Sequence, residues 1–436
     1  MGELYEVGTL NTMPSPDLFN AVIGSWARRS QSMPFDAPAR CAAIIKHMEG
    51  IADNNVLVHA EEGQDNSELS VKWNKFHVDE KSYLITFGAF KSALHCRELT
   101  ESEDAVIIAT QADEMLQHMI NRVKCGKEEA RPTGEIYATV AACYGKAIEL
   151  LSEELEREHD VLREAGVDFI GAKGFDTKLS SALARLNTLL EEMESGLGRH
   201  DVNPDLSINA YTEVIRAWNN VILHPDAQEE VLRIVTRVID LYEHGNQHLS
   251  PTSDMFDMAI NTLLRNGSPA NTCEAFELLQ EQERLHLEGN PSCKPSIQNY
   301  RSILAAFDDK PQEVARVLNR MTILYESNVV DELHENTGNT SLGFHELLEL
   351  WQNVDKSGGD AASWAESMLL RVAKDVHESN SRCSDSTKVL RTKNFNAVIK
   401  AWLEVGEIHR AATLFDEMDE LGNHPLLNDV KPDHLR

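Results

Sequence analysis

The sequence lacks the features that mark several large classes of protein. It contains no run of about 18 uncharged apolar residues, which excludes a membrane-spanning helix, and no membrane partner is expected. It has no C-x-x-C pair, and its seven cysteines are scattered along the chain. This pattern argues against a disulfide framework or a zinc site and favours a reducing compartment. The N-terminal residues have neither an apolar signal core nor an Arg-rich, acid-poor transit segment.

Basic residues are also scarce relative to acidic ones. The 436 residues include 41 Lys and Arg against 71 Asp and Glu, so the formal net charge is −30. Affinity for nucleic acid depends largely on cations that neutralise phosphates. The chain can therefore bind RNA only if its basic side chains gather on one surface, and a well-solvated acidic exterior is the simpler interpretation of the charge.

What the sequence does contain is an internal repeat. FNAVIGSW at residues 19–26 returns as FNAVIKAW at residues 395–402. An aromatic at i, apolar or small residues at i+3 and i+4, and an aromatic at i+7 lie on one face of a helix. We call these segments A helices, and the spacing predicts that Trp26, Trp218, Trp351 and Trp402 at i+7 are buried. Further copies begin at Tyr83, Tyr137, Tyr211, Phe256, Tyr300 and Phe344.

A second periodic segment follows each A helix. It has a small or apolar residue, an apolar pair three residues later and usually a Met, as in Cys41, Ile44, Ile45 and Met48. We call these segments B helices. No alternating strand pattern lies between them, so the sequence predicts an all-α fold, a right-handed α-solenoid of about eight helix-turn-helix repeats.

The array is predicted to cover residues 14–433 as one domain. Its A helices should start near residues 17, 81, 135, 209, 254, 298, 342 and 393. Residues 148–180 form an insertion within the third repeat, predicted as a charged helical extension followed by a Gly-rich loop. Because the last residues, KPDHLR, look like the start of a ninth repeat, we expect the chain to be part of a longer protein.

These motifs resemble the pentatricopeptide repeat family. Residues 395–418, FNAVIKAWLEVGEIHRAATLFDEM, and VKPD at 430–433 match its pattern almost throughout, and the middle copies are degenerate. Tetratricopeptide repeats are the competing family, but their characteristic Gly and close-packing small residues are not repeated here. The resemblance implies a non-catalytic protein of RNA processing, stability or translation in a mitochondrion or plastid. The absent transit segment leaves the cytoplasm open.

The resemblance also implies modular recognition of single-stranded RNA, with one base per repeat. The reading residues would be the one after the leading aromatic and the last of the same repeat. These are Asn20 with Asp79 in the first repeat and Asn396 with Asp433 in the eighth, an Asn/Asp combination that favours uracil. Thr212 with Thr252 is the remaining candidate pair. The other pairs, which include Leu84 with Thr133, Ala138 with Ser207 or Asp205, and Asp257 with Ser296, do not fit the family's code.

Two further departures weaken sequence-specific reading. The position three residues before the first reading residue, where the family has an aliphatic side chain that sandwiches bases, is polar in seven copies. It holds Asp17, Lys81, Glu135, Asn209, Asp254, Gln298, Leu342 and Lys393. The alternative function is a protein-interaction scaffold that kept the repeat fold without the RNA code.

No motif indicates catalysis. H-x-E occurs, but without the P-C-x-x-C that a zinc deaminase needs. His47 and His118 each precede an inward Met and are expected to be exposed. No enzyme activity, cofactor or metal is predicted, and the expected partners are single-stranded RNA containing uracil, or other proteins.

Overall fold

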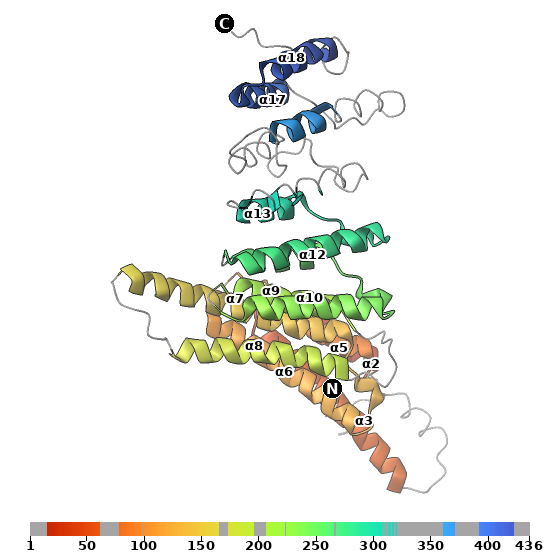
Figure 1. Cartoon of the computed structure of the whole chain (residues 1–436). Helices are drawn as coiled ribbons and strands as arrows, with labels where there is room; N and C mark the ends of the chain where they lie inside the picture. The colour runs from red at the N-terminus through yellow and green to blue at the C-terminus, as the bar shows by residue number, and fades with distance from the viewer. Residues whose placement is uncertain are drawn as a thin grey trace. The chain divides into compact units, whose positions relative to one another are not determined.

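The computed structural model describes the chain as an assembly of helices. The described residues are 15–61, 78–97, 99–164, 173–195, 206–222, 224–265, 267–307, single positions of 310–320, 361–370 and 392–422. None of them lies in a β-strand, so the all-α prediction is confirmed over this part of the chain. The chain divides into two compact units, Met1–Pro251 and Thr252–Arg436, which are described separately (Figure 1).

The first unit consists of helix pairs that follow the predicted A–B alternation. Its A helices are α2 (Pro16–Ala27), α5 (Glu80–Ala93), α7 (Gly134–Glu164) and α9 (Ile208–Asn220). Its B helices are α3 (Asp36–Glu61), α6 (Ser102–Lys124), α8 (Lys173–Ser195) and α10 (Ala227–Glu243). Each A helix contacts its own B helix, and α2, α5 and α7 each contact the next A helix along the chain. The pairs are therefore stacked in chain order within this unit (Figure 1).

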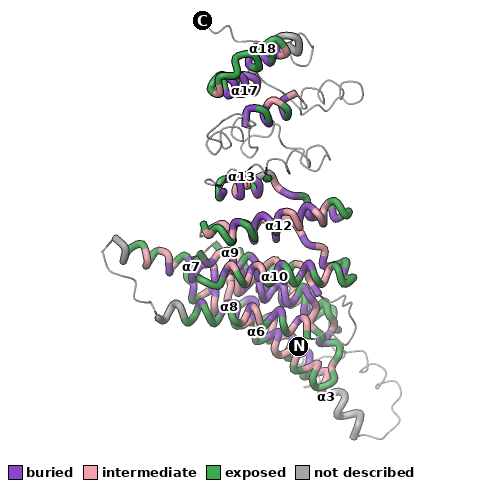
Figure 2. Tube along the Cα trace, in the orientation of Figure 1, coloured by how far each residue is buried: buried purple, intermediate pink, exposed green. Residues whose placement is uncertain are grey.

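The aromatic positions of the A helices form much of the core between these layers. Tyr83 and Tyr211 are fully buried at the leading position, and Trp218 is buried at i+7. Trp26, predicted to be buried, is only half-buried. The guanidinium groups of Arg29 and Arg40 lie 6.0 and 5.2 Å from its ring centroid, so cations partly cover a ring that the prediction placed between helices. Figure 2 shows buried residues concentrated where the helices of this unit face one another.

The connections from B helices to A helices repeat one design. α6, α10 and α12 (Pro269–Leu287) are each followed by a glycine with positive φ, Gly126, Gly245 and Gly289. A positive φ is accessible to glycine without a Cβ clash, which suits the end of a helix. A short 3-10 helix comes next, and then a proline that precedes the next A helix. These 3-10 helices are η1 (Glu128–Ala130), η2 (Gln247–Leu249) and η3 (Pro291–Cys293).

The segment predicted as an insertion, residues 148–180, is largely a lengthening of α7 and α8. α7 continues as a helix to Glu164, in agreement with the predicted charged helical extension. The predicted Gly-rich loop is wrong from Lys173 onward, because α8 begins there; residues 165–172 lie outside the described residues. The extension supports its neighbours: Ser102 donates from its N–H and its hydroxyl to Glu154, at 3.2 and 2.7 Å. A carboxylate from α7 therefore caps the N-terminus of α6.

The second unit contains the described helices from residue 253 onward. They are α11 (Ser253–Leu264), α12, α13 (Ile297–Ala306), a helix over residues 361–370, α17 (Thr392–Val405) and α18 (Ile408–Gly422). α11 contacts α12 and α13, and α17 contacts α18. Trp402 is 4% exposed, as its i+7 position predicted. The A helix predicted near 342 and its Trp351 lie outside the described residues.

Candidate functional site

The first candidate pair is brought together at the N-termini of α2 and α5. Asp79 is the N-cap of α5 and accepts from the N–H and hydroxyl of Ser82 at 2.9 and 2.5 Å. Asn20 Nδ2 donates to the same Asp79 Oδ1 at 3.4 Å. The residue after a leading aromatic thus meets the residue that starts the next A helix, one repeat further on.

Asn20 is turned inward at this junction. It is 6% exposed, and its Oδ1 atom is buried without a hydrogen-bond partner. A buried acceptor without a partner carries a desolvation cost of about 1–3 kcal/mol. Asn20 therefore links two repeats, and a ligand reaches its amide only by displacing the 3.4 Å contact with Asp79.

The same arrangement recurs in the fifth repeat, at residues that do not fit the family's code. Asp257 follows the leading Phe256, and its Oδ1 accepts from Ser296 Oγ at 3.5 Å and from Asn299 Nδ2 at 2.7 Å. Ser296 is the N-cap of α13. Burial raises the pKa of Asp257, and the hydrogen bond from Asn299 opposes that shift. The register that the resemblance implies therefore gives the same contact in both units.

The remaining candidate residues each have a different environment. Thr212 is half-buried on α9, and its hydroxyl donates to the Ile208 carbonyl of its own helix at 2.9 Å. Thr252 is the N-cap of α11 in the second unit and makes no side-chain cap bond. Asn396 is exposed on α17. Asp433 lies outside the described residues.

The base-sandwiching positions of the first unit are polar and exposed. They are Asp17, Lys81, Glu135 and Asn209. Asn209 Nδ2 donates to Glu135 Oε1 at 3.0 Å, which joins these positions of α9 and α7. A base inserted between these two repeats would have to break that bond.

Basic residues on or beside the A helices are further candidate binding residues, which the code positions do not include. Arg28 follows the C-terminus of α2, Lys91 lies in the last turn of α5, and Lys146 and Arg216 lie within α7 and α9. Arg28 and Lys91 are exposed and have no ion-pair partner among the described residues. Lys146 and Arg216 pair with acids one helical turn away, at 3.0 and 2.5 Å. Arg28, Lys91 and Lys146 lie eight or nine residues after the leading aromatic, which an alignment of the A helices could have revealed, whereas Arg216 lies five residues after it.

Neither a protein-family model nor a curated protein matches this sequence. The likeness to pentatricopeptide repeats therefore depends on the sequence motifs and stays a prediction. Over the described residues, no helix is both long and apolar enough to cross a membrane. The same residues contain no group of three or more His, Cys, Asp or Glu able to hold a metal ion.

A second recurring cluster, not foreseen from the sequence, fastens successive repeats. We call it the junction triad: a leading Tyr, a Glu from the preceding B helix, and a basic side chain from the next B helix. Tyr83 donates to Glu49 at 2.5 Å, Tyr211 to Glu194 at 2.8 Å and Tyr300 to Glu283 at 2.6 Å. The basic side chains are His118, 2.5 Å from Glu49, Arg237, 2.8 Å from Glu194, and Arg320 beside Glu283.

The triads correct one prediction about histidines. His118, expected to be exposed, is partly covered because its ring nitrogen contacts the buried Glu49. His47 is exposed, as predicted, with its ring 6.4 Å from that of Phe19. Burial, followed by the hydrogen bond to Glu49, raises the pKa of Tyr83 well above its usual range. Each triad is therefore a structural contact whose members bond to one another.

Proposed function

We propose that the chain is a non-catalytic helical-repeat protein that binds single-stranded RNA along its A helices. In this proposal it is a right-handed α-solenoid of about eight helix pairs of the pentatricopeptide type, acting in RNA processing, stability or translation in a mitochondrion or plastid. The observation that carries the proposal is the repeated contact between the two code positions. It occurs between Asn20 and Asp79 at 3.4 Å and between Asp257 and Ser296 at 3.5 Å.

The row of cations supports the same mode of binding. A ligand that uses one nucleotide per repeat presents one phosphate per repeat, and Arg28, Lys91, Lys146 and Arg216 supply at least one cation in or beside each A helix of the first unit. Since α2, α5, α7 and α9 contact one another in order, a strand crossing them meets these four helices in succession. Four neutralised phosphates imply a slope of log affinity against log salt of about −3.

Base discrimination should be poor under this proposal. Asn20 and Asp257 are already bonded within the protein, and Thr212 bonds its own helix. Each of these side chains must exchange an internal bond for one to a base, so the net gain per base is small. We therefore expect weak, salt-sensitive binding with a modest preference for uracil.

A protein-interaction scaffold is the second candidate, and one contact favours it. The Glu135–Asn209 hydrogen bond at 3.0 Å joins neighbouring base-sandwiching positions, and the net charge of −30 repels phosphate. A solenoid that lost its RNA code keeps an elongated surface for a protein partner.

Affinity for a uracil-only strand of about twelve nucleotides separates the two candidates. Fluorescence anisotropy should detect binding at about 50 mM salt and a large loss at about 150 mM. Lys91→Gln should weaken every RNA alike and reduce the salt slope by about 0.7. Lys46→Gln is the matched control, because Lys46 is exposed on the B helix α3. No binding at the lower salt, or equal effects of both variants, would favour the scaffold.

A further inference from the structure

The junction triads follow a rule that one junction breaks. At three junctions the residue after the inward Met or Gln of the B helix is Glu, and the next leading aromatic is Tyr. At a fourth junction the same two sequence positions hold Ile239 and Phe256. Ile239 has no carboxylate to accept a hydrogen bond, and Phe256 has no hydroxyl to donate one. Between the second and third repeats these positions hold Ile120 and Tyr137. Only this combination has a hydroxyl with no internal carboxylate to receive it.

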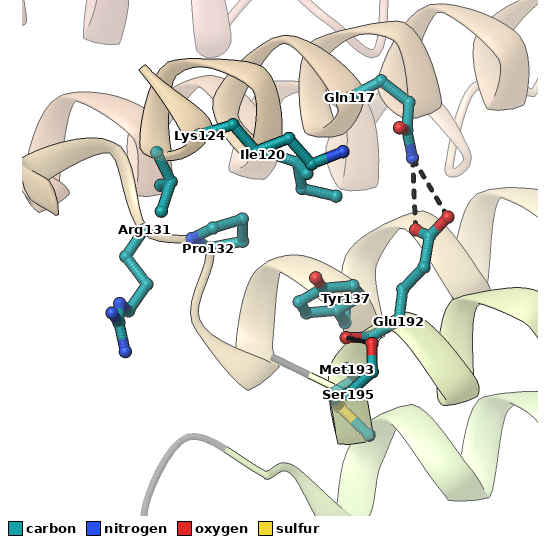
Figure 3. A pocket seen from close by; sticks show the side chains of 10 residues that line it. Gln117, Ile120, Lys124, Arg131, Pro132, Tyr137, Glu192, Met193 and Ser195 are labelled. Carbon is teal, nitrogen blue, oxygen red and sulfur yellow. Dashed lines mark hydrogen bonds between the residues drawn. The ribbon is translucent and has the colours of Figure 1, made fainter. Parts of the chain in front are cut away.

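A cavity lies at this mismatched junction. It has a volume of about 360 Å³ and is bounded by the end of α6, the Arg131–Pro132 segment, the start of α7 and the end of α8. Figure 3 shows the hydroxyl end of Tyr137 turned toward the side where Ile120 and Pro132 lie. Tyr137 is 8% exposed, and its hydroxyl makes no hydrogen bond within the described part of the chain. Burial, followed by the charge of Glu192, raises the pKa of Tyr137 to about 12, so the hydroxyl keeps its proton at neutral pH and can donate it.

Two of the three charged residues that line the cavity are in ion pairs. Lys124 and Arg131 line it and are exposed, and Arg131 pairs with Glu128 at 2.6 Å. Glu192 also lines it, at the position where the triads have their basic side chain. The carboxylate of Glu192 forms an ion pair with Arg185 at 2.9 Å and accepts a hydrogen bond from the amide of Gln117 at 3.1 Å. Since Glu192 is already paired, Lys124 is the lining charge without an ion-pair partner among the described residues.

We propose that this cavity binds a carboxylate on an apolar body, which completes the mismatched junction as Glu49 completes the first one. The carboxylate accepts from Tyr137 and lies near Lys124, and the apolar body contacts Ile120, Pro132 and Met193. The three triads show that the leading Tyr of three other repeats accommodates a carboxylate. The ligand is either a free organic acid or the C-terminal residue of a peptide. The site goes beyond the proposed RNA binding, which uses the A-helix cations.

Titration of the full chain with 3-phenylpropionate tests the site. Ligand-observed NMR should give a dissociation constant on the order of 1 mM, as expected for a ligand of this size. The neutral 3-phenylpropionamide should bind at least about tenfold more weakly, because it lacks the charged acceptor. Acetyl-Gly-Phe with a free carboxylate, compared with its amide, distinguishes a peptide C-terminus from a small acid. Equal binding of acids and amides would overturn the proposal.

Substitutions locate the ligand in the cavity. Tyr137→Phe should weaken acid binding about fivefold, and Glu192→Gln should strengthen it by removing a like charge. Tyr242→Phe, at a half-buried tyrosine of α10 outside the cavity, is the control for the first variant. An unchanged affinity in Tyr137→Phe, with a helical circular dichroism spectrum retained, would contradict the site.

Ile120→Glu supplies the missing carboxylate from within. It should abolish binding of the acid and raise the melting temperature, because the junction then holds its own Tyr–carboxylate bond. Ile107→Glu adds the same charge to α6 at a residue that is 46% exposed, and it should change neither property. Acid binding that survives Ile120→Glu would place the ligand elsewhere. Loss of RNA binding plays no part in these measurements, so the two proposals fail independently.

Discussion

The first and eighth repeats begin with the same five residues, FNAVI, yet their asparagines have different environments. Asn20 in α2 is buried and bonded to Asp79, whereas Asn396 in α17 is exposed. In both copies the leading Phe and the Ile four residues later are buried. The local sequence therefore sets the helix and its inward face. Whether the Asn can meet a ligand depends on a partner 59 residues away along the chain.

The largest expected difference between the two copies concerns their tryptophans. Trp402 is 4% exposed and Trp26 is half-buried, although both occupy the i+7 position. Trp402→Ala should lower the free energy of unfolding by ~3–5 kcal/mol, and Trp26→Ala by about half as much because less apolar area is removed from water. Denaturant unfolding measures both, with hydrogen exchange in α17 and α18 as a second readout, since repeat arrays do not always unfold as one unit. Equal losses would mean that the first copy is packed as tightly as the eighth.

Removing Asp79 should make the first copy more like the eighth. Asp79→Ala deletes the N-cap of α5 and leaves the buried Nδ2 of Asn20 without an acceptor. The two losses together should cost ~2–3 kcal/mol. Asp17→Ala is the matched control, because Asp17 is exposed in the first turn of α2 and should change stability by less than about 0.5 kcal/mol. Thermal unfolding measures both variants. Similar shifts in melting temperature would show that the contact between Asn20 and Asp79 contributes little to stability.

The sequence was informative where a structure depends on neighbours one or two helical turns apart. The aromatic at i and i+7 located α2, α5, α9 and α17, because a 3.6-residue period places those side chains on one face. Only the family resemblance predicted that Asn20 and Asp79 act as a pair. Their hydrogen bond to each other was not predicted, because a sequence pattern does not show which polar groups bond to one another.

Contacts between segments far apart in the sequence could not be predicted. Glu154 reads as part of a charged helix face, yet it caps α6 through Ser102, 52 residues away. Glu49 likewise reads as a solvated acid and is 2% exposed beside Tyr83. An acidic residue on a B helix has the same local pattern whether it faces water or the next repeat. Alignment of the repeats carries a trace of the difference, because Glu precedes the leading Tyr at three junctions, whereas Ile precedes Tyr137 and Phe256 at two others.

Residues of the second repeat complete the junction triad of the first. This triad predicts that the free energy of unfolding depends on pH. Tyr83→Phe should cost about 1 kcal/mol near neutral pH, because it removes the hydrogen bond to Glu49. The folded-state pKa of Tyr83 is raised, so its contribution is fully present below about pH 10, the unfolded value, and is lost as the pH rises above it. The gap in unfolding free energy between wild type and Tyr83→Phe should therefore narrow above about pH 10. A gap that stays constant to pH 11 would show that the buried tyrosine does not couple folding to ionisation.

The smallest effect on stability, and the most informative one for function, is expected at Asn396. Because Asn396 is exposed, Asn396→Ala should change the free energy of unfolding by less than about 0.5 kcal/mol. Its amide is not buried against a neighbouring repeat, so it can reach a base without the bond exchange that Asn20 requires. Under the RNA proposal, Asn396→Ala should weaken binding of a uracil-only strand severalfold and change binding of an adenine-only strand much less. Lys400→Gln, one turn further along the exposed side of α17, should weaken both strands alike, because a cation contacts phosphate rather than base. If Asn396→Ala and Lys400→Gln give the same profile across the two strands, the eighth repeat contributes charge and reads no base.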